Sequence, residues 1–345
     1  MPALSPVPAR MPAWTYRRYG PPEVLRLEEL PVPVPGPKDI LVHVHATTVN
    51  RTDCGFRSAE YVVSRLFSGL FRPKRPVLGC EFAGEVAAVG AEVERFQVGD
   101  RVFGYDDGRF GAHAAYMTTP AYGAVALLPD GWSCIEAAPL TEGVHYAWGN
   151  LKAARIGAGS QVLVNGATGA IGSGAVQLAV SMGATVTAVC ATPHVERVRA
   201  LGAHAVIDRL TTDFRTLPGP YDLVFDAVGK SRFKLCKHLL ARDGCYISTE
   251  LGPRGENVFL ALIGGLRKGP HVRFPIPAIN AADVAHFRRM AEAGTLRPLI
   301  DRVVDFDTMV EAHRYVETGE KIGNVVVRVA PEGGGTRAGG PRPVR

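Results

Sequence analysis

The residues best suited to chemistry lie in a glycine-rich turn, NGATGAIG, at residues 165–172. An apolar run precedes the turn, and an amphipathic helical pattern follows it as far as Met182. Such a turn lets backbone N–H groups approach a dinucleotide pyrophosphate, and the helix N-terminus adds partial positive charge. Ala167 replaces the first glycine of the usual G-x-G-x-x-G pattern, so a purely structural turn is the alternative. The flanking strand and helix favour cofactor binding, with expected contacts from Gly166, Ala167, Thr168, Gly169, Ala170 and Ile171.

The choice between NAD and NADP depends on the end of the next predicted strand, where an acid would accept the ribose hydroxyls of NAD. That strand ends at Cys190, and the first acid after it is Glu196. We therefore expect NADPH, with NADH as the alternative coenzyme. Cys190, Thr192, His194 and Arg209 are the expected contacts at this end of the cofactor, although Arg209 could equally be a solvated loop residue.

Two halves with different hydrophobic periods must position these residues. Residues 14–129 contain short apolar runs separated by proline and glycine, which is typical of a mainly β structure. Residues 130–295 alternate strand-like runs with helical patterns, which is typical of a doubly wound parallel sheet. Residues 296–331 look β again, so we expect the chain to return to the first domain.

The composition is that of an ordinary globular protein, with 46% apolar and 21% charged residues in a chain of 345. The net charge of +6 is spread out, and basic residues are not interleaved with aromatic ones, so we expect no nucleic-acid partner. No apolar stretch approaches the roughly 18 residues that span a membrane, and the six cysteines are scattered. We expect a cytoplasmic protein with no membrane partner and with flexible ends at 1–11 and 332–345.

Six motifs together resemble one protein family. They are NRTD (50–53), GCEFAGEV (79–86), VGDRVFG (98–104), EGVHYA (142–147), NGATGAIG (165–172) and FDAVGK (225–230). Their types and order are similar to those of medium-chain dehydrogenases and reductases of the quinone-oxidoreductase type. The resemblance covers roughly residues 12–330.

The resemblance implies an α/β fold with two domains. A GroES-like, β-rich catalytic domain would comprise residues 12–129 plus 296–331, and a Rossmann cofactor domain would comprise 130–295. It also implies a homodimer or higher homo-oligomer, and substrate and nicotinamide that meet between the domains. Further cofactor contacts are expected from Asn50, Thr141, Val228, Lys321 and Asn324.

Zinc-dependent alcohol dehydrogenases of the same superfamily carry cysteine and histidine ligands at positions that correspond here to Asn50, Cys80 and Thr141. A catalytic zinc ion needs about three Cys, His or carboxylate ligands. One thiol with an amide and a hydroxyl does not make such a set, so we expect no zinc. His113 and His145 are the nearby residues that could rescue a site.

Without a metal, hydrogen-bond donors must stabilise the negative charge that hydride transfer builds on an acceptor oxygen. The candidates are Tyr61, which follows Asp53 where related enoyl reductases carry a tyrosine acid, and the pair His145 and Tyr146. The alternative role is a packing aromatic for Tyr146 and a surface loop residue for Tyr61. The resemblance places the amide of Asn50 near the nicotinamide and the substrate, and Asp53 is expected to fix the loop.

These features predict a zinc-independent, NADPH-dependent oxidoreductase for a small-molecule acceptor that is already activated, such as a quinone or an α,β-unsaturated carbonyl compound. A biosynthetic pathway is one setting for such a reaction. An alcohol or aldehyde dehydrogenase of the same superfamily is one alternative. An NADPH-binding structural or regulatory protein with little turnover is another.

Overall fold

The computed structural model describes residues 6–59, 65, 68–264, 268–276 and 278–332. The chain divides into two compact units. The first contains residues 1–141, 279–293 and 300–345, and the second contains 142–278 and 294–299. Among the described residues, no helix has the length and apolar character needed to cross a membrane.

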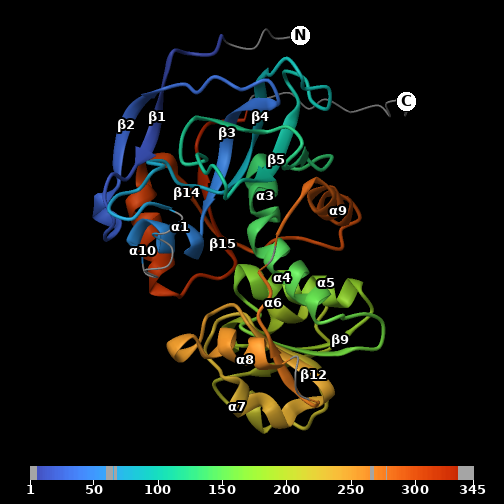
Figure 1. Cartoon of the computed structure of the whole chain (residues 1–345). Helices are drawn as coiled ribbons and strands as arrows, with labels where there is room; N and C mark the ends of the chain where they lie inside the picture. Colours follow the sequence, from blue (N-terminus) through green and yellow to red (C-terminus); the bar gives the residue numbers. More distant parts are fainter. Residues whose placement is uncertain (1–5, 60–64, 66–67, 265–267, 277, 333–345) are drawn as a thin grey trace. The chain divides into compact units, whose positions relative to one another are not determined.

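A seven-stranded sheet forms the centre of the first unit (Figure 1). Its strands are β3 (Asp39–Val49), β4 (Glu81–Val89), β5 (Arg101–Tyr105), β6 (Tyr116–Pro120), β7 (Ala124–Leu127), β14 (Ile300–Asp305) and β15 (Asn324–Arg328). The order is β14-β15-β3-β4-β5-β7, and β6 also pairs with β3. Ile40, Val42 and Val44 alternate along β3 and are fully buried in one core with Phe82. This alternation is the period-2 pattern of a strand with one face in the core.

Smaller elements complete the first unit. β1 (Arg10–Thr15) and β2 (Arg26–Pro31) pair as a separate antiparallel sheet. The helices are α1 (Arg51–Ser58), α3 (Cys134–Ala137), α9 (Ala281–Glu292) and α10 (Met309–Thr318). α1 packs on α10, and α9 packs on β7. β14 and β15 join the seven-stranded sheet through the pairing of β15 with β3.

A six-stranded, fully parallel sheet forms the second unit. Its strands are β8 (Gln161–Asn165), β9 (Thr185–Cys190), β10 (Ala205–Asp208), β11 (Tyr221–Asp226), β12 (Leu240–Ser248) and β13 (His271–Arg273). The spatial order is β10-β9-β8-β11-β12-β13, so successive strands are added to one side of β8 as far as β10 and to its other side from β11 onward. The switch point between β8 and β11 is where doubly wound sheets bind dinucleotides. The predicted Rossmann topology is confirmed.

The helices of this unit include α4 (Glu142–Ala153), which precedes β8 and packs on α5 (Ala170–Ser181). α5, α6 (Val195–Arg199), α7 (Phe233–Cys236) and α8 (Glu256–Gly264) lie between successive strands. Crossovers between parallel strands are right-handed. α5 and α6 therefore cover one face of the sheet, and α7 and α8 cover the other. Leu163, Val224 and Tyr246 are fully buried in the core of this unit.

The boundaries of the compact units differ from the predicted domains. Residues 130–141 and helix α9 belong to the first unit, although the sequence placed them in the Rossmann domain. The reason is long-range packing, because the backbone and hydroxyl of Thr141 bond to the carboxylate of Glu81 in β4. β1 begins at Arg10, so the last two residues of the predicted flexible segment 1–11 belong to a strand.

Candidate functional site

The predicted cofactor turn connects β8 to α5. Gly166 has φ +82°, a left-handed conformation that glycine adopts without a steric penalty, and a Cβ there would lie 2.3 Å from Val228. Gly169 is the N-cap of α5, and no side chain caps this twelve-residue helix. A helix N-terminus without a side-chain cap, at the switch point of a parallel sheet, fits a dinucleotide pyrophosphate. Gly166, Ala167, Thr168, Gly169, Ala170, Ile171 and Val228 therefore lie together.

Gly172 has a packing role behind this turn. A Cβ on Gly172 would lie 2.1 Å from the carbonyl oxygen of Gly166. Only glycine lets α5 approach the turn so closely, and the distance is far inside van der Waals contact. The absence of a side chain at Gly172 therefore lets α5 pack directly against the cofactor turn.

The first turn of α4 crosses the start of α5. A Cβ on Gly143 would lie 2.7 Å from the backbone of Ala170, so the two helices pack backbone to backbone at this point. His145 is buried, and its ring centroid lies 4.6 Å from that of the half-buried Tyr146. The two predicted proton donors are therefore in contact with each other, in a helix that packs on the cofactor helix.

The residues expected to contact the adenosine end of the cofactor lie where β9 and β10 end. The backbone N–H of Arg209 donates to the carbonyl of Cys190 at 2.8 Å. The hydroxyl of Thr192 donates to the carboxylate of Asp208 at 2.5 Å, and that hydrogen bond lowers the pKa of Asp208. Burial raises the pKa of the Cys190 thiol, so this thiol is a neutral group in the site. His194 ends the short 3-10 turn that begins at Thr192.

A buried carboxylate, Glu81, organises the predicted site residues of the first unit. One oxygen accepts hydrogen bonds from the amide of Asn50 (2.8 Å) and the hydroxyl of Thr48 (2.7 Å). The other accepts from the backbone N–H and the hydroxyl of Thr141 at 3.0 and 2.8 Å. Glu81 has no exposed surface, so four donors take the place of its hydration shell. It thereby connects two of the three positions that correspond to zinc ligands.

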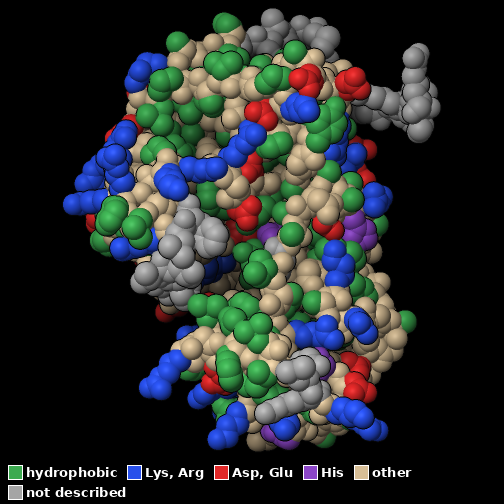
Figure 2. Space-filling model, in the orientation of Figure 1, with side chains coloured by type: hydrophobic (Ala, Val, Ile, Leu, Met, Phe, Trp, Pro, Cys, Tyr) green, Lys and Arg blue, Asp and Glu red, His purple; other side chains and the backbone are tan. Residues whose placement is uncertain are grey.

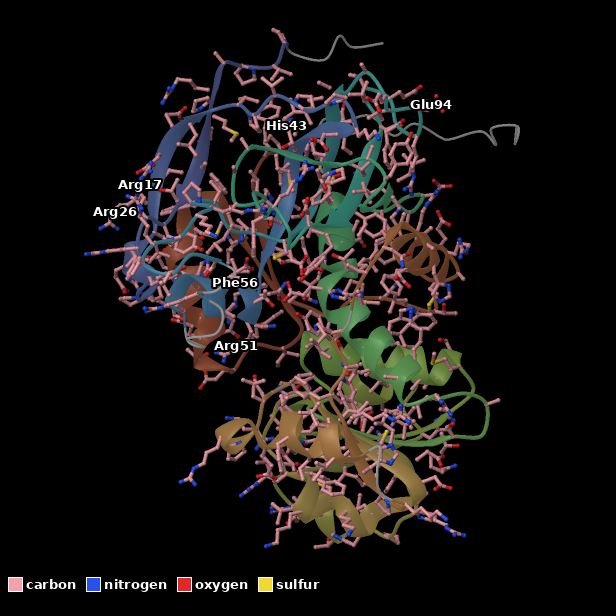
Figure 3. All side chains as sticks on the ribbon, viewed as in Figure 1. Arg17, Arg26, His43, Arg51, Phe56 and Glu94 are labelled. Atoms are coloured by element: carbon pink, nitrogen blue, oxygen red, sulfur yellow. The ribbon has the colours of Figure 1, made fainter. Side chains whose placement is uncertain are left out.

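Asp53 fastens the loop that carries Asn50. Its two carboxylate oxygens accept from the backbone N–H groups of Asn50 at 2.9 Å and Gly79 at 3.0 Å. Asn50 and Asp53 also form a reciprocal capping box at the start of α1, whose Arg51 and Phe56 are marked in Figure 3. Burial raises the pKa of Asp53, while His113 and these backbone groups oppose the shift. These bonds fit the loop-fixing role expected of Asp53.

Of the remaining predicted site residues, the structure describes Asn324 and Lys321. Asn324 is buried at the start of β15, directly before Val325, and Val325 pairs with Val49 directly before Asn50. Asn324 and Asn50 are therefore cross-strand neighbours. The amine of Lys321 donates to the carbonyl of Gly323. Tyr61 lies outside the described residues.

The donor set at the zinc-equivalent positions does not suit a zinc ion. Asn50 and Thr141 both direct donor groups at Glu81, and zinc binds deprotonated sulfur, imidazole nitrogen or carboxylate oxygen. Cys80 is buried, and the imidazole Nε2 of His113 lies 2.9 Å from the carbonyl of Thr48. Within the described ranges, no three His, Cys, Asp or Glu side chains form a group that could hold a metal.

Two family models match the chain. The alcohol dehydrogenase GroES-like domain matches residues 36–130, and the zinc-binding dehydrogenase domain matches residues 201–327. The first match lies within the β-rich unit as the sequence predicted, and the second includes β10 to β13 of the parallel sheet.

Characterised proteins match over nearly the whole chain. A 2-methylene-furan-3-one reductase of Solanum lycopersicum is 32% identical over 94% of this chain and 81% of its own length. An NADPH-dependent alkenal/one oxidoreductase, chloroplastic, of Arabidopsis thaliana is 30% identical with the same coverage. The structure of a quinone oxidoreductase from Coxiella burnetii superposes with a TM-score of 0.82 and 27% identity, covering 93% of this chain and all of that one.

Proposed function

The chain belongs to the medium-chain dehydrogenase and reductase superfamily, and on this premise we propose that it uses NADPH to reduce a quinone or an α,β-unsaturated carbonyl compound. The observation that carries the coenzyme half of the proposal is the uncapped N-terminus of α5 at the switch point between β8 and β11. The names of the two plant relatives support the acceptor half.

When bound, reduced nicotinamide supplies the hydride. The residues of the chain then have three tasks. The turn at 166–171 binds the pyrophosphate through backbone N–H groups, and Cys190, Thr192, His194 and Arg209 hold the adenosine end. His145, Tyr146 or Tyr61 donates a proton to the acceptor oxygen, on which negative charge develops. Asn50, held by Glu81 and Thr48, orients groups near the reacting atoms.

We propose that no zinc takes part. The support is the donor set described above, in which amide, hydroxyl and backbone hydrogens surround Glu81. An enzyme that lacks metal polarisation depends on an acceptor that is already electron-poor, which favours conjugated carbonyls and quinones over simple ketones. Stoichiometric zinc in the purified protein, together with loss of activity to a chelator, would contradict this.

The assay that tests the proposal is NADPH and NADH oxidation against a panel of quinones, enals, enones and saturated aldehydes. We expect turnover with the conjugated acceptors and quinones, and little with the saturated aldehydes. Preferred oxidation of alcohols would support a dehydrogenase instead. Tight NADPH binding without turnover on any acceptor would support a structural or regulatory role.

We further propose a homodimer or larger assembly in the cytoplasm. Leu262 and Ile276, near the edge strand β13, are 75% and 90% exposed, which is unusual for large apolar side chains. All six cysteines are free and buried, as suits a reducing compartment. Sedimentation velocity tests the assembly, and a concentration-independent monomer would contradict it.

A further inference from the structure

A cavity lies on the Rossmann unit, between α7 and α8. Its volume is about 550 Å³, within the roughly 300–1,000 Å³ of small-molecule sites. Its walls come from the segments that follow β11 and β12, whereas the cofactor turn follows β8 and the expected adenosine contacts follow β9 and β10. The proposed function assigns no role to this cavity.

The floor of the cavity is apolar. Phe233 and Leu260 are half-buried and pack against the core of the unit, and the ring of Phe233 lies 6.4 Å from that of Tyr246. Phe259 adds a second aromatic ring that is 63% exposed. An exposed phenylalanine beside a cavity is an apolar surface that a ligand can cover.

The rim is strongly basic. Arg232, Lys234, Lys237 and Arg254 line the cavity with one carboxylate, Glu256, which gives a local charge of +3 (4 minus 1). Glu256 is already paired with Arg232. No acidic partner among the described residues pairs with the other three cations. Figure 2 shows basic and hydrophobic side chains next to each other over α7 and α8.

The backbone of Arg254 is strained at this rim. It has φ +54° and ψ +27°, a left-handed conformation that is sterically unfavourable for a residue other than glycine. Gly252 and Gly255 nearby are also left-handed, so glycine would suit this turn better than arginine. Strain of this kind is commonly retained at ligand sites, where the side chain is needed.

We propose that this cavity binds a small soluble amphipathic anion. The apolar chain or ring of the ligand lies over Phe233, Phe259 and Leu260. Its phosphate, sulfate or carboxylate group lies among Lys234, Lys237 and Arg254. The apolar floor and the unpaired cations are both needed, because neither alone distinguishes such a ligand from a neutral lipid or a free anion.

The test is calorimetric titration of the full chain with monomeric dodecyl phosphate. Dodecyl maltoside has the same chain with a neutral head, and inorganic phosphate has the charge without the chain. We expect binding of dodecyl phosphate only, weakened by added salt. The double variant Lys234→Glu, Lys237→Glu should weaken it about tenfold or more, because each reversal replaces an attraction to the anionic head group with a repulsion. The matched control, Arg242→Glu with Lys268→Glu, alters exposed cations of the same unit outside the cavity and should leave binding unchanged.

Arg254→Gly separates a ligand role from a structural one. It removes a cation and relieves the strained backbone, so binding should weaken about fivefold while the melting temperature stays equal or rises. A lower melting temperature with unchanged binding would overturn the proposal. So would equal binding by both double variants, or binding of dodecyl maltoside as tight as that of the phosphate.

Two further outcomes also count against the proposal. Displacement of dodecyl phosphate by NADPH would assign the cavity to the coenzyme. Loss of self-association in the Lys234→Glu, Lys237→Glu variant, without ligand binding by the unaltered chain, would assign it to an interface between copies. The proposed function stands apart from all these outcomes, because it is measured by turnover on the acceptor panel.

Discussion

Asp208 at the end of β10 accepts a 2.5 Å hydrogen bond from the hydroxyl of Thr192, which follows β9. This hydrogen bond lowers the pKa of Asp208, so the carboxylate is ionised at neutral pH. Asp208 pairs with Cys190 at the end of β9, the strand end where an acid would accept ribose hydroxyls and repel a 2′-phosphate. We expect Arg209, the next residue, to attract that phosphate. We therefore predict that the preference for NADPH or NADH depends on these two adjacent charges.

Replacing Asp208 with asparagine should shift this preference towards NADPH. The amide oxygen can still accept from Thr192, so the loop is kept while the negative charge is removed. We expect the ratio of kcat/KM for NADPH to that for NADH to rise about tenfold, or about 1.4 kcal/mol. Steady-state kinetics with both coenzymes measure it. Asp243→Asn, at an exposed site of the same unit, is the control, and an unchanged ratio in Asp208→Asn would show that the carboxylate does not face the ribose.

Replacing Arg209 with alanine should act in the opposite direction. Loss of a cation beside the 2′-phosphate should weaken NADPH about tenfold and leave NADH unchanged, because only NADPH carries that phosphate. Fluorescence titration gives both dissociation constants. Arg242→Ala, elsewhere in the unit, should affect neither. Equal losses for the two coenzymes would rule out a phosphate contact by Arg209.

Local sequence signals predicted most of the fold. The apolar runs at 161–165, 185–190 and 221–226 became neighbouring strands of the parallel sheet, since buried strands show in the sequence as short continuous apolar segments. The boundary between the units was not predictable in this way. It depends on contacts such as Thr141 with Glu81, which are 60 residues apart.

The candidate site was likewise predictable where its residues are consecutive and not where they are far apart in the sequence. The cofactor turn was predictable because its strand, glycines and helix are consecutive. Asp208 and Glu81 were missed, because their partners Thr192 and Asn50 lie 16 and 31 residues away and become neighbours only when strands pair. The available signals were an acid at the end of a predicted strand, and an acid directly after Cys80 in the strand-like segment GCEFAGEV.

Glu81→Gln should disturb the position of Asn50. The backbone N–H of Thr141 requires an oxygen on its side, so the new NH₂ group must face the amide nitrogen of Asn50, which also donates. Two donors then oppose each other in a buried site, at a cost of about 1–3 kcal/mol. We expect kcat to fall about tenfold or more, and the free energy of unfolding to drop.

The control for Glu81→Gln is Glu92→Gln, which removes a carboxylate from an exposed ion pair with Lys38 and should change nothing. Unaltered kcat in Glu81→Gln would show that the position of Asn50 does not matter for turnover. A parallel loss of NADPH affinity would show that Asn50 or Thr141 also contacts the coenzyme, as the sequence predicts.

His45 in β3 should make the stability of the protein depend on pH. Burial, assisted by His43 (Figure 3) and Arg101, lowers the pKa of His45 to about 4, against about 6.5 in an unfolded chain. Between these values the unfolded state binds more protons, so stability is fully present above pH 6.5 and is lost as pH falls towards 4. From pH 7.5 to 5 the loss should be about 2 kcal/mol.

Urea unfolding at several pH values measures this effect. His45→Gln should lack the part of the pH dependence that comes from His45. Between pH 7.5 and 5, the unfolding free energy of the unaltered protein should therefore fall about 2 kcal/mol more than that of His45→Gln. His238→Gln, which alters an exposed histidine of the other unit, should keep the full dependence. Parallel pH profiles for the unaltered protein and His45→Gln would contradict the assignment.

Two glycines of α5 should respond in opposite ways to alanine. A Cβ on Gly172 would lie 2.1 Å from the carbonyl oxygen of Gly166, and a backbone atom cannot move away without displacing the cofactor turn. On Gly174 the nearest atom would be 3.4 Å away, at ordinary contact distance, and alanine in a helix gains up to about 1 kcal/mol over glycine. Gly172→Ala should therefore lower the melting temperature and abolish measurable NADPH binding. Gly174→Ala should keep both or raise the melting temperature. Thermal unfolding measures the melting temperatures, and titration measures NADPH binding. Retained NADPH binding in Gly172→Ala would mean that the turn at 166–171 does not hold the coenzyme.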